Sequence, residues 1–353
     1  MSCCHPEVVV SWRSVSIGVA LGCITACTAG PTAQGEHPAP ETTSFQPLPR
    51  PHTGGGLAAA ETNRECERCH REIASEWRGS LHQRAFVEPA YQRALQREPL
   101  PFCRACHAPE SVDLAADPPS AIAALGVGCV TCHGAKQILA GPRPSAAANG
   151  EAPHPVVRSA AFAGAGACAG CHEFPFPDEA LRGASGAELM QSTITEQAHS
   201  PRPDVTCAQC HMPRDETLAH RTHDFRSSRD AAWVRSALDA RAARVGQHEV
   251  EVTLQPTAVG HAVPTGDLFR RLEVSAEVVG NDYMVLARRE RHLTRRWATT
   301  HRPHSGFALR ELQRDDRPGR QGSTPTRVRF DLGELAASHP VAWRVAYQRV
   351  AHP

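Results

Sequence analysis

Apolar residues follow different patterns in successive parts of this 353-residue chain. A short apolar run, Val15 to Ala26, follows Arg13. It is too short to span a bilayer, and its length and basic flank are typical of a signal peptide. The next residues, to about Ala60, are rich in Pro, Gly, Thr and Ala and lack apolar periodicity, which predicts a flexible tether. We therefore expect a signal peptide over 1–27 and a linker over 28–60.

Helical spacing characterises the middle of the chain. Apolar residues recur at this spacing over 73–81 and again over 189–198. The Ala- and Arg-rich run from Ser228 to Arg244 predicts one further helix that closes this part. The pattern predicts a mainly α and irregular domain over 61–245.

The apolar period changes to two after residue 245. Val250, Val252 and Leu254 alternate with polar residues. The same alternation occurs at 272–278, 328–332 and 341–347, and the turn Gly280-Asn281-Asp282 leads to a short apolar run at 284–286. This pattern predicts a small antiparallel β-sandwich-like domain over 246–353.

Composition limits the possible partners and the kind of core. The formal net charge is +1, so the chain has no general attraction to nucleic acid. Only 5% of residues are aromatic, so side chains alone do not give a large aromatic core. Six arginines and one acid lie between Arg288 and Arg302. They are either a solvated face or a docking surface for an acidic partner or ligand group.

Ten of the 14 cysteines form one repeated pattern, Cys-x-x-Cys-His, which is the attachment signature of haem c. We number the five copies as motifs 1 to 5 in chain order. They are Cys66, Cys69 and His70; Cys103, Cys106 and His107; Cys129, Cys132 and His133; Cys168, Cys171 and His172; and Cys207, Cys210 and His211.

The chemistry of the pattern explains its residue types. Two thiols form thioethers to the vinyl groups of the haem, and the adjacent histidine binds the iron as proximal ligand. Zinc sites and disulfides also use Cys-x-x-Cys, but neither explains a histidine after every pair. Five covalent haems over this length leave roughly 30 residues for each, too few for separate protein cores. We expect a haem-packed pentahaem domain whose haems lie close enough to share electrons.

The second iron ligands are expected to be histidines outside the motifs, which would make the haems bis-His and low in potential. His82 and His199 each follow an apolar helical pattern, His154 lies in a proline-rich loop, and His261 lies in a turn-rich segment between two strands. His223 follows motif 5, with His220 as its rival. Three methionines, Met190, Met212 and Met284, are alternative sulfur ligands, although Met212 directly follows a proximal histidine. The remaining histidines are expected at the surface.

The segment Ile24-Thr25-Ala26-Cys27 resembles a bacterial lipobox, which predicts acylation of Cys27 and a lipid anchor. An ordinary cut near Ala29, or a cut before Cys23, is the alternative, and both still export the chain. The expected location is periplasmic, or the outer membrane as a lipoprotein.

Several stretches resemble the large bacterial multihaem cytochrome c family that includes hydroxylamine oxidoreductase and its tetrahaem electron-accepting cytochrome. The resemblance covers most of residues 61 to 285. The matching stretches are Glu76-Trp77-x-x-Ser80-x-His82, Gly126-Val127-Gly128-Cys129-x-x-Cys132-His133-Gly134, Cys207-x-x-Cys210-His211-Met212-Pro213 leading to His223-Asp224-Phe225, and His261-x-x-Pro264-Thr265-Gly266. The resemblance implies that His82, His154, His199, His223 and His261 are distal haem ligands.

Departures from the enzymes of that family favour an electron carrier. Ammonia-forming nitrite reductases use lysine as one proximal ligand, whereas all five motifs here end in histidine and the one lysine, Lys136, follows such a motif. Hydroxylamine oxidoreductases have more haems and a crosslinking tyrosine, and this chain has only Tyr91, Tyr283 and Tyr347. The expected function is electron transfer between redox proteins. The alternatives are reduction of a small nitrogen or sulfur oxyanion at one five-coordinate haem, and a binding module in the β-rich domain.

Overall fold

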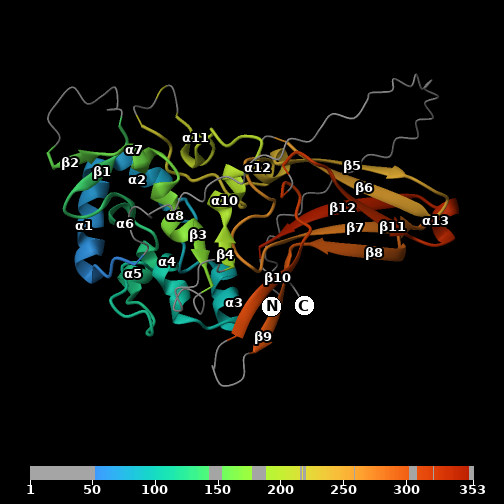
Figure 1. The fold of residues 1–353 in the computed structure, drawn as a ribbon, viewed down its shortest axis with the longest axis horizontal. Helices are drawn as coiled ribbons and strands as arrows, with labels where there is room; N and C mark the ends of the chain where they lie inside the picture. Colours follow the sequence, from blue (N-terminus) through green and yellow to red (C-terminus); the bar gives the residue numbers. More distant parts are fainter. Residues whose placement is uncertain are drawn as a thin grey trace, which may run out of the picture.

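The computed structural model describes residues 52–142, 153–176, 188–214, 217, 220–257, 259–301, 308–320 and 322–349. The predicted signal peptide, Cys27 and most of the predicted linker lie outside these residues. Figure 1 shows two parts side by side, one of short helices and short strands and one of long strands. None of the described helices has the length and apolar character needed to cross a membrane.

Short helices dominate the first part, and every motif lies at or next to the end of one. The elements are α1 Gly56–Cys69, α2 Arg71–Arg78, α3 Pro89–Arg97, a 3-10 turn at Pro101–Cys103, α4 Arg104–His107, α5 Ser120–Leu125, α6 Cys129–His133, β1 Ile138–Ala140, β2 Val156–Arg158, α7 Ala160–Ala163, α8 Gly166–His172, β3 Glu173–Pro175, β4 Leu189–Ser192, α10 Thr193–Ala198, α11 Cys207–His211 and α12 Ala231–Ser236. A helix turn places the two thiols and the histidine of each motif on neighbouring positions of one surface.

Helix α1 begins earlier than the predicted end of the linker. The alanines at its start favour a helix, and Ala59 and Ala60 are buried. The preceding backbone is also fixed, because the amides of Thr53 and Gly54 donate to the carbonyl of Pro109. The linker prediction was therefore wrong for residues 56–60.

The apolar core of the first part is small and lies away from most of the motifs. It consists of Ala60, Trp77, Phe86, Tyr91, Ala108, Ile122 and Leu125. The indole of Trp77 donates to the carbonyl of Val127 at 2.8 Å, which ties α2 to the segment before motif 3. Helices α6, α8 and α11, which carry three motifs, contribute no residue to this cluster. These three helices therefore lie outside the main apolar cluster of the first part.

Gly126 allows two chain segments to approach closely. It has a φ of 58°, and a Cβ at this position would overlap the carbonyls of His82 and Gln83. The next amide, that of Val127, donates to the carbonyl of His82 at 2.9 Å. The backbone of His82 is thereby fixed against the start of motif 3.

Two antiparallel three-stranded sheets form the second part. Their orders are β11-β6-β5 and β12-β7-β8. The strands are β5 Leu238–Arg244, β6 Glu249–Pro256, β7 Arg271–Val279, β8 Val285–Leu293, β11 Thr326–Asp331 and β12 Val341–Gln348, with the short helix α13 Leu335–Ser338 before β12. Buried residues of both sheets, including Val252, Val274, Val328 and Val345, share one apolar cluster. The predicted antiparallel strands are therefore present in two small sheets, and alternating burial along β6 explains why the sequence pattern predicted them.

Two element predictions were wrong. The predicted helix over 228–244 is helical only over α12, because Leu238 and Ala240 are buried in β5 and pair with β6. Similarly, residues 189–192 form strand β4, and helix α10 begins only afterwards. In both cases pairing with another strand outweighs local helix propensity.

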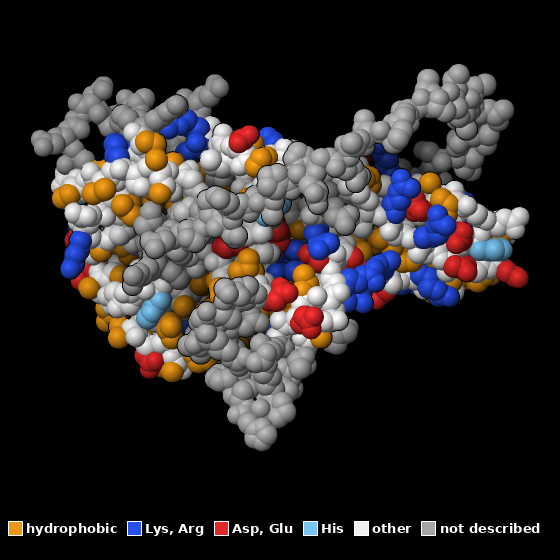
Figure 2. All heavy atoms as spheres, viewed as in Figure 1, with side chains coloured by type: hydrophobic (Ala, Val, Ile, Leu, Met, Phe, Trp, Pro, Cys, Tyr) orange, Lys and Arg blue, Asp and Glu red, His pale blue; other side chains and the backbone are white. Residues whose placement is uncertain are grey.

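The arginine-rich segment forms β8 and part of a second hairpin, β9 Arg295–His301 with β10 Ala308–Asp315. Figure 2 shows basic side chains gathered over the β-rich part with acidic ones between them. Arg288 pairs with Glu273, Glu277 and Glu290. The charge of Arg288 is therefore neutralised within the chain.

Candidate haem centres

None of the ten motif cysteines forms a disulfide. Within the described part of the chain, no group of three or more His, Cys, Asp or Glu could hold a metal ion such as zinc. Burial raises the pKa of Cys132 to about 12 and that of Cys103 to about 11. Before haem attachment, a thiol at either position is therefore protonated at pH 7.

Thiols of different motifs lie in contact. The sulfur of Cys129 in motif 3 lies against that of Cys66 in motif 1. Motif 4 has two such contacts, because Cys168 lies against Cys207 of motif 5 and Cys171 lies against Cys106 of motif 2. Cys171 is also near Cys132 of motif 3. The motifs thus form one connected set in which motif 4 is next to motifs 2, 3 and 5.

Four motif histidines each face a histidine from outside the motifs. The ring centres are 6.2 Å apart for His70 and His154, 6.3 Å for His172 and His82, 6.4 Å for His133 and His223, and 6.2 Å for His211 and His261. Seven of these eight rings are half-buried and His70 is exposed. Four of the five predicted distal histidines are therefore brought to motif histidines, and each is brought to a different one.

These separations match two imidazoles on opposite faces of one metal. An imidazole nitrogen binds a transition metal at about 2 Å, and the ring centre lies roughly 1.1 Å behind that nitrogen, so two ring centres across one metal lie roughly 6.2 Å apart. Directly stacked aromatic rings lie closer. The four pairs therefore have the spacing of bis-histidine haem iron.

The other ring nitrogen is oriented by the backbone in most of these histidines. The Nδ1 atoms of His133, His211, His223 and His261 bond to main-chain carbonyls at 2.7 to 2.9 Å. When Nδ1–H donates to a carbonyl, Nε2 keeps a free lone pair for a metal. The residues present therefore fit the group that the motifs imply.

Burial keeps several of the paired imidazoles in the neutral form that binds iron. It lowers the pKa of His82 to about 4, that of His172 to about 3 and that of His223 to about 4. A protonated imidazole has no lone pair to donate. These three histidines are therefore ready to act as ligands at pH 7.

His82 is packed from the side by an aromatic ring. Phe225 meets it edge to face with ring centres 4.2 Å apart, and Nδ1 of His82 is buried without a hydrogen-bond partner. Nδ1 of His154 is buried and unpartnered as well. Buried polar atoms normally have partners, so these two point to a bound group that is not protein.

The structure distinguishes His223 from its rival. His223, not His220, faces the ring of His133. Nε2 of His220 instead contacts Glu76 at 3.2 Å, and Glu76 also accepts from the amide of His223 at 2.8 Å. His220 is thus an accessory residue that helps Glu76 fix the His223 loop.

His107 of motif 2 has a different environment. Its Nδ1 bonds to the carbonyl of Ala85 at 2.8 Å, as expected for a proximal ligand, and Tyr91 stacks on it with ring centres 3.8 Å apart. The hydroxyl of Tyr91 is buried without a partner. Across the residues with described positions, no second histidine ring faces His107 in the way seen for the other four.

His199 is the predicted distal ligand that has no such pairing. It lies exposed at the end of α10, and its Nδ1 bonds to the carbonyl of Thr195. No ring contact joins it to a motif histidine in the described segments. Its role as a ligand stays a prediction.

Sequence reasoning missed the residues that support the ligands. Glu76 and Phe225 lie within stretches that it singled out, but spacing along the chain gave them no role. Tyr91 was missed because its only signal is its place among the buried residues of α3, with Ala90 and Ala94. Contacts between distant segments decide all three roles.

Comparisons with known proteins agree with this geometry. Residues 65–134, which contain motifs 1 to 3, match the family model of cytochrome c554 and c-prime. The fold is similar to the crystal structure of a penta-heme cytochrome c552 from Thermochromatium tepidum, with a TM-score of 0.60 and 18% sequence identity, over 81% of this chain and 90% of that chain. No curated protein shows a significant match. The two matches support a multihaem cytochrome c.

Proposed function

We propose that this chain is an exported pentahaem cytochrome c that transfers electrons along closely packed haems, at least four of them with two histidine ligands. The observation that carries the proposal is the set of four opposed histidine pairs, each at the spacing of ligands across one iron. Covalently held haem supplies reversible one-electron chemistry at its iron. An iron with histidine ligands on both faces has no open position for a substrate, so four such irons favour electron transfer over substrate binding.

The contacts between motifs give an order for the haems. Motif 1 touches motif 3, motif 3 is next to motif 4, and motif 4 touches motifs 2 and 5. The proposed path therefore runs from motif 1 through motif 3 to motif 4, where it divides toward motifs 2 and 5. Motif 4 is the junction.

The two ends of the path lie in different surroundings. Cys69 and His70 of motif 1 are exposed, and Figure 1 places α1 at the end of the molecule away from the long strands. Motif 5 lies on α11, and its partner histidine comes from the segment between β6 and β7. We propose that one redox protein exchanges electrons at motif 1 and another near motif 5 or motif 2.

The location of the protein is proposed from its first residues. The predicted signal peptide implies export, and acylation of Cys27 would attach the chain to a membrane through the linker that precedes α1. Covalent haem attachment after export to a bacterial periplasm agrees with this location. The expected partners are redox proteins of that compartment, and no nucleic acid is among them.

Mass spectrometry with potentiometry tests the proposed function. The mature holoprotein is expected to have the mass of the polypeptide plus five haems, and all five are expected to titrate reversibly. A mass with fewer haems, or haems that do not titrate, would contradict a five-haem electron carrier. The same mass measurement shows whether a lipid is present on Cys27.

A second candidate function rests on His107. Since no histidine ring faces it in the described residues, the iron bound at motif 2 is a candidate five-coordinate site, as required for reduction of a small nitrogen or sulfur oxyanion. EPR of the oxidised protein is expected to show a high-spin signal from about one fifth of the haem, with the rest low-spin. Five low-spin signals would instead place a ligand, such as His199 or Met190, on this iron and remove the second candidate.

A further inference from the structure

The segment that carries His261 connects two strands of the β-rich part but reaches the helical part. It runs from Gly260 to Asp267, between β6 and β7, and brings His261 opposite His211 with the two rings only 13° from parallel. A loop histidine loses much conformational freedom when its ring is held in one orientation. Its neighbours must therefore supply the restraint.

Glu196, on helix α10, holds this loop from the helical side. Its Oε2 accepts hydrogen bonds from the amide of Ala262 at 3.2 Å and from the hydroxyl of Thr265 at 2.7 Å. Thr265 also contacts the hydroxyl of Thr193 at 2.9 Å. The loop is thus bonded to α10 on both sides of Pro264.

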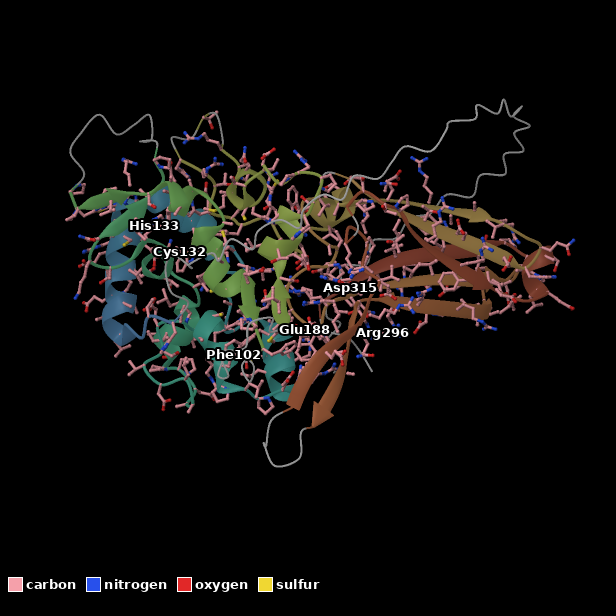
Figure 3. All side chains as sticks on the ribbon, in the orientation of Figure 1. Phe102, Cys132, His133, Glu188, Arg296 and Asp315 are labelled. Atoms are coloured by element: carbon pink, nitrogen blue, oxygen red, sulfur yellow. The ribbon has the colours of Figure 1, made fainter. Side chains whose placement is uncertain are left out.

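Arg317 holds the same loop from the side of the strands. Its guanidinium donates to the carbonyl of Pro264 at 2.8 Å and to Oε1 of Glu196 at 2.8 Å. It also donates two hydrogen bonds to Asp315, the residue labelled at the junction of the two parts in Figure 3. The side chain of Arg317 is only 4% exposed, so this charged network is shielded from solvent.

The connection after β10 adds backbone contacts. The amide of Val263 donates to the carbonyl of Pro318 at 2.8 Å. Gly319 has a φ of 83°, and a Cβ there would lie 2.9 Å from the carbonyl oxygen of His261. The loop is therefore enclosed between α10 and the segment that joins β10 to β11.

We propose that Glu196 and Arg317 are positioning residues that keep His261 on the iron of motif 5, so that contact between the two parts of the molecule maintains the sixth ligand of this haem. The inference rests on the proposed function, because it requires a haem at motif 5. Charged hydrogen bonds to the loop hold the backbone on either side of the ligand. Loss of these bonds frees the loop and leaves His211 as the sole protein ligand of the iron at motif 5.

Carbon monoxide binding by the reduced holoprotein tests this role. His261→Ala is expected to add a CO-binding component of about one fifth of the haem above wild type, with five haems retained. Glu196→Gln and Thr265→Val are each expected to add part or all of the same component. The double variant Glu196→Gln with His261→Ala is expected to bind no more CO than His261→Ala alone, because both changes open the same iron.

Matched controls separate positioning from general loss of stability. Glu273→Gln removes a carboxylate that is similarly buried and paired with arginines but has no described hydrogen bond to this loop, and it is expected to leave CO binding unchanged. Thr265→Ser keeps the hydroxyl and is expected to behave as wild type.

The outcomes separate failure of this inference from failure of the proposed function. If His261→Ala adds CO binding but neither Glu196→Gln nor Thr265→Val does, the positioning role is refuted and the ligand assignment stands. If His261→Ala adds no CO binding although five haems are present, His261 is not a ligand, and the inference fails with that assignment. If Glu196→Gln does not fold, Thr265→Val alone decides.

Discussion

A variant with serine at Cys129 and Cys132 is expected to contain four haems and to lose fast electron exchange between motif 1 and the other motifs. Without both thiols, motif 3 cannot form its thioethers. Motif 3 lies between motif 1 and motif 4, because Cys129 contacts Cys66 and Cys132 lies near Cys171. In stopped-flow reduction, the haems of wild type are expected to exchange electrons faster than they are reduced, so that reduction follows a single phase. The variant is expected to show a separate phase for about one quarter of its remaining haem.

The matched control removes a terminal haem. The double change Cys207→Ser and Cys210→Ser also leaves four haems, but motifs 1, 3, 4 and 2 stay connected. This variant is expected to keep a single reduction course. Retention of one course in the motif 3 variant, with four haems confirmed by mass, would refute the proposed order.

The haem-attachment motifs, and four of the histidines that lie opposite them, were the most predictable features of this chain. Cys-x-x-Cys-His needs no tertiary structure to be recognised, because one helical turn already places its thiols and histidine together. His82 was predictable for a similar reason, since it follows the apolar face of α2 that ends in buried Trp77. His261 was singled out by a turn-rich segment between two predicted strands, and both strands are present.

The pairing of these histidines was not predictable from the sequence. His82 faces motif 4 and not motif 1, which it follows directly in the chain. Similarly, His154 faces motif 1, although it precedes motif 4. Each pairing joins segments far apart in sequence and depends on how the short helices pack. Contacts such as the Gly126 approach to His82 fix this packing, and one sequence without its fold does not reveal them.

The composition of the strands between the two parts of the molecule did not indicate their structure. Residues 238–244 are rich in Ala and Arg, which favour helices, but Leu238 and Ala240 find a buried place beside β6. The arginines of 288–302 suggested a surface face, yet Arg295 is buried and donates to carbonyls of Met190 and Gly266. Its role in joining the two parts follows only from tertiary contacts.

Replacement of His82 by alanine is expected to open the iron at motif 4, the proposed junction of the electron path. His82 faces His172 at 6.3 Å, and its backbone is held independently of its ring through the amide of Val127. Truncation should therefore remove the ligand and leave the fold in place. CO binding by the reduced protein is expected to rise by about one fifth of the haem, with a matching high-spin EPR signal when oxidised.

His82→Met and His248→Ala make this prediction specific to ligation. Methionine fills similar space and offers a thioether sulfur, so it is expected to restore the low-spin state and to raise the midpoint potential of one haem. The described hydrogen bond of the His248 side chain goes to the carbonyl of Gly333 in the β-rich part, so its removal is expected to leave CO binding unchanged. If His82→Ala retains five haems and binds no more CO than wild type, His82 is not a ligand. The 6.3 Å pairing with His172 would then reflect packing alone, and the same spacing at the other three motifs would no longer indicate ligation by itself.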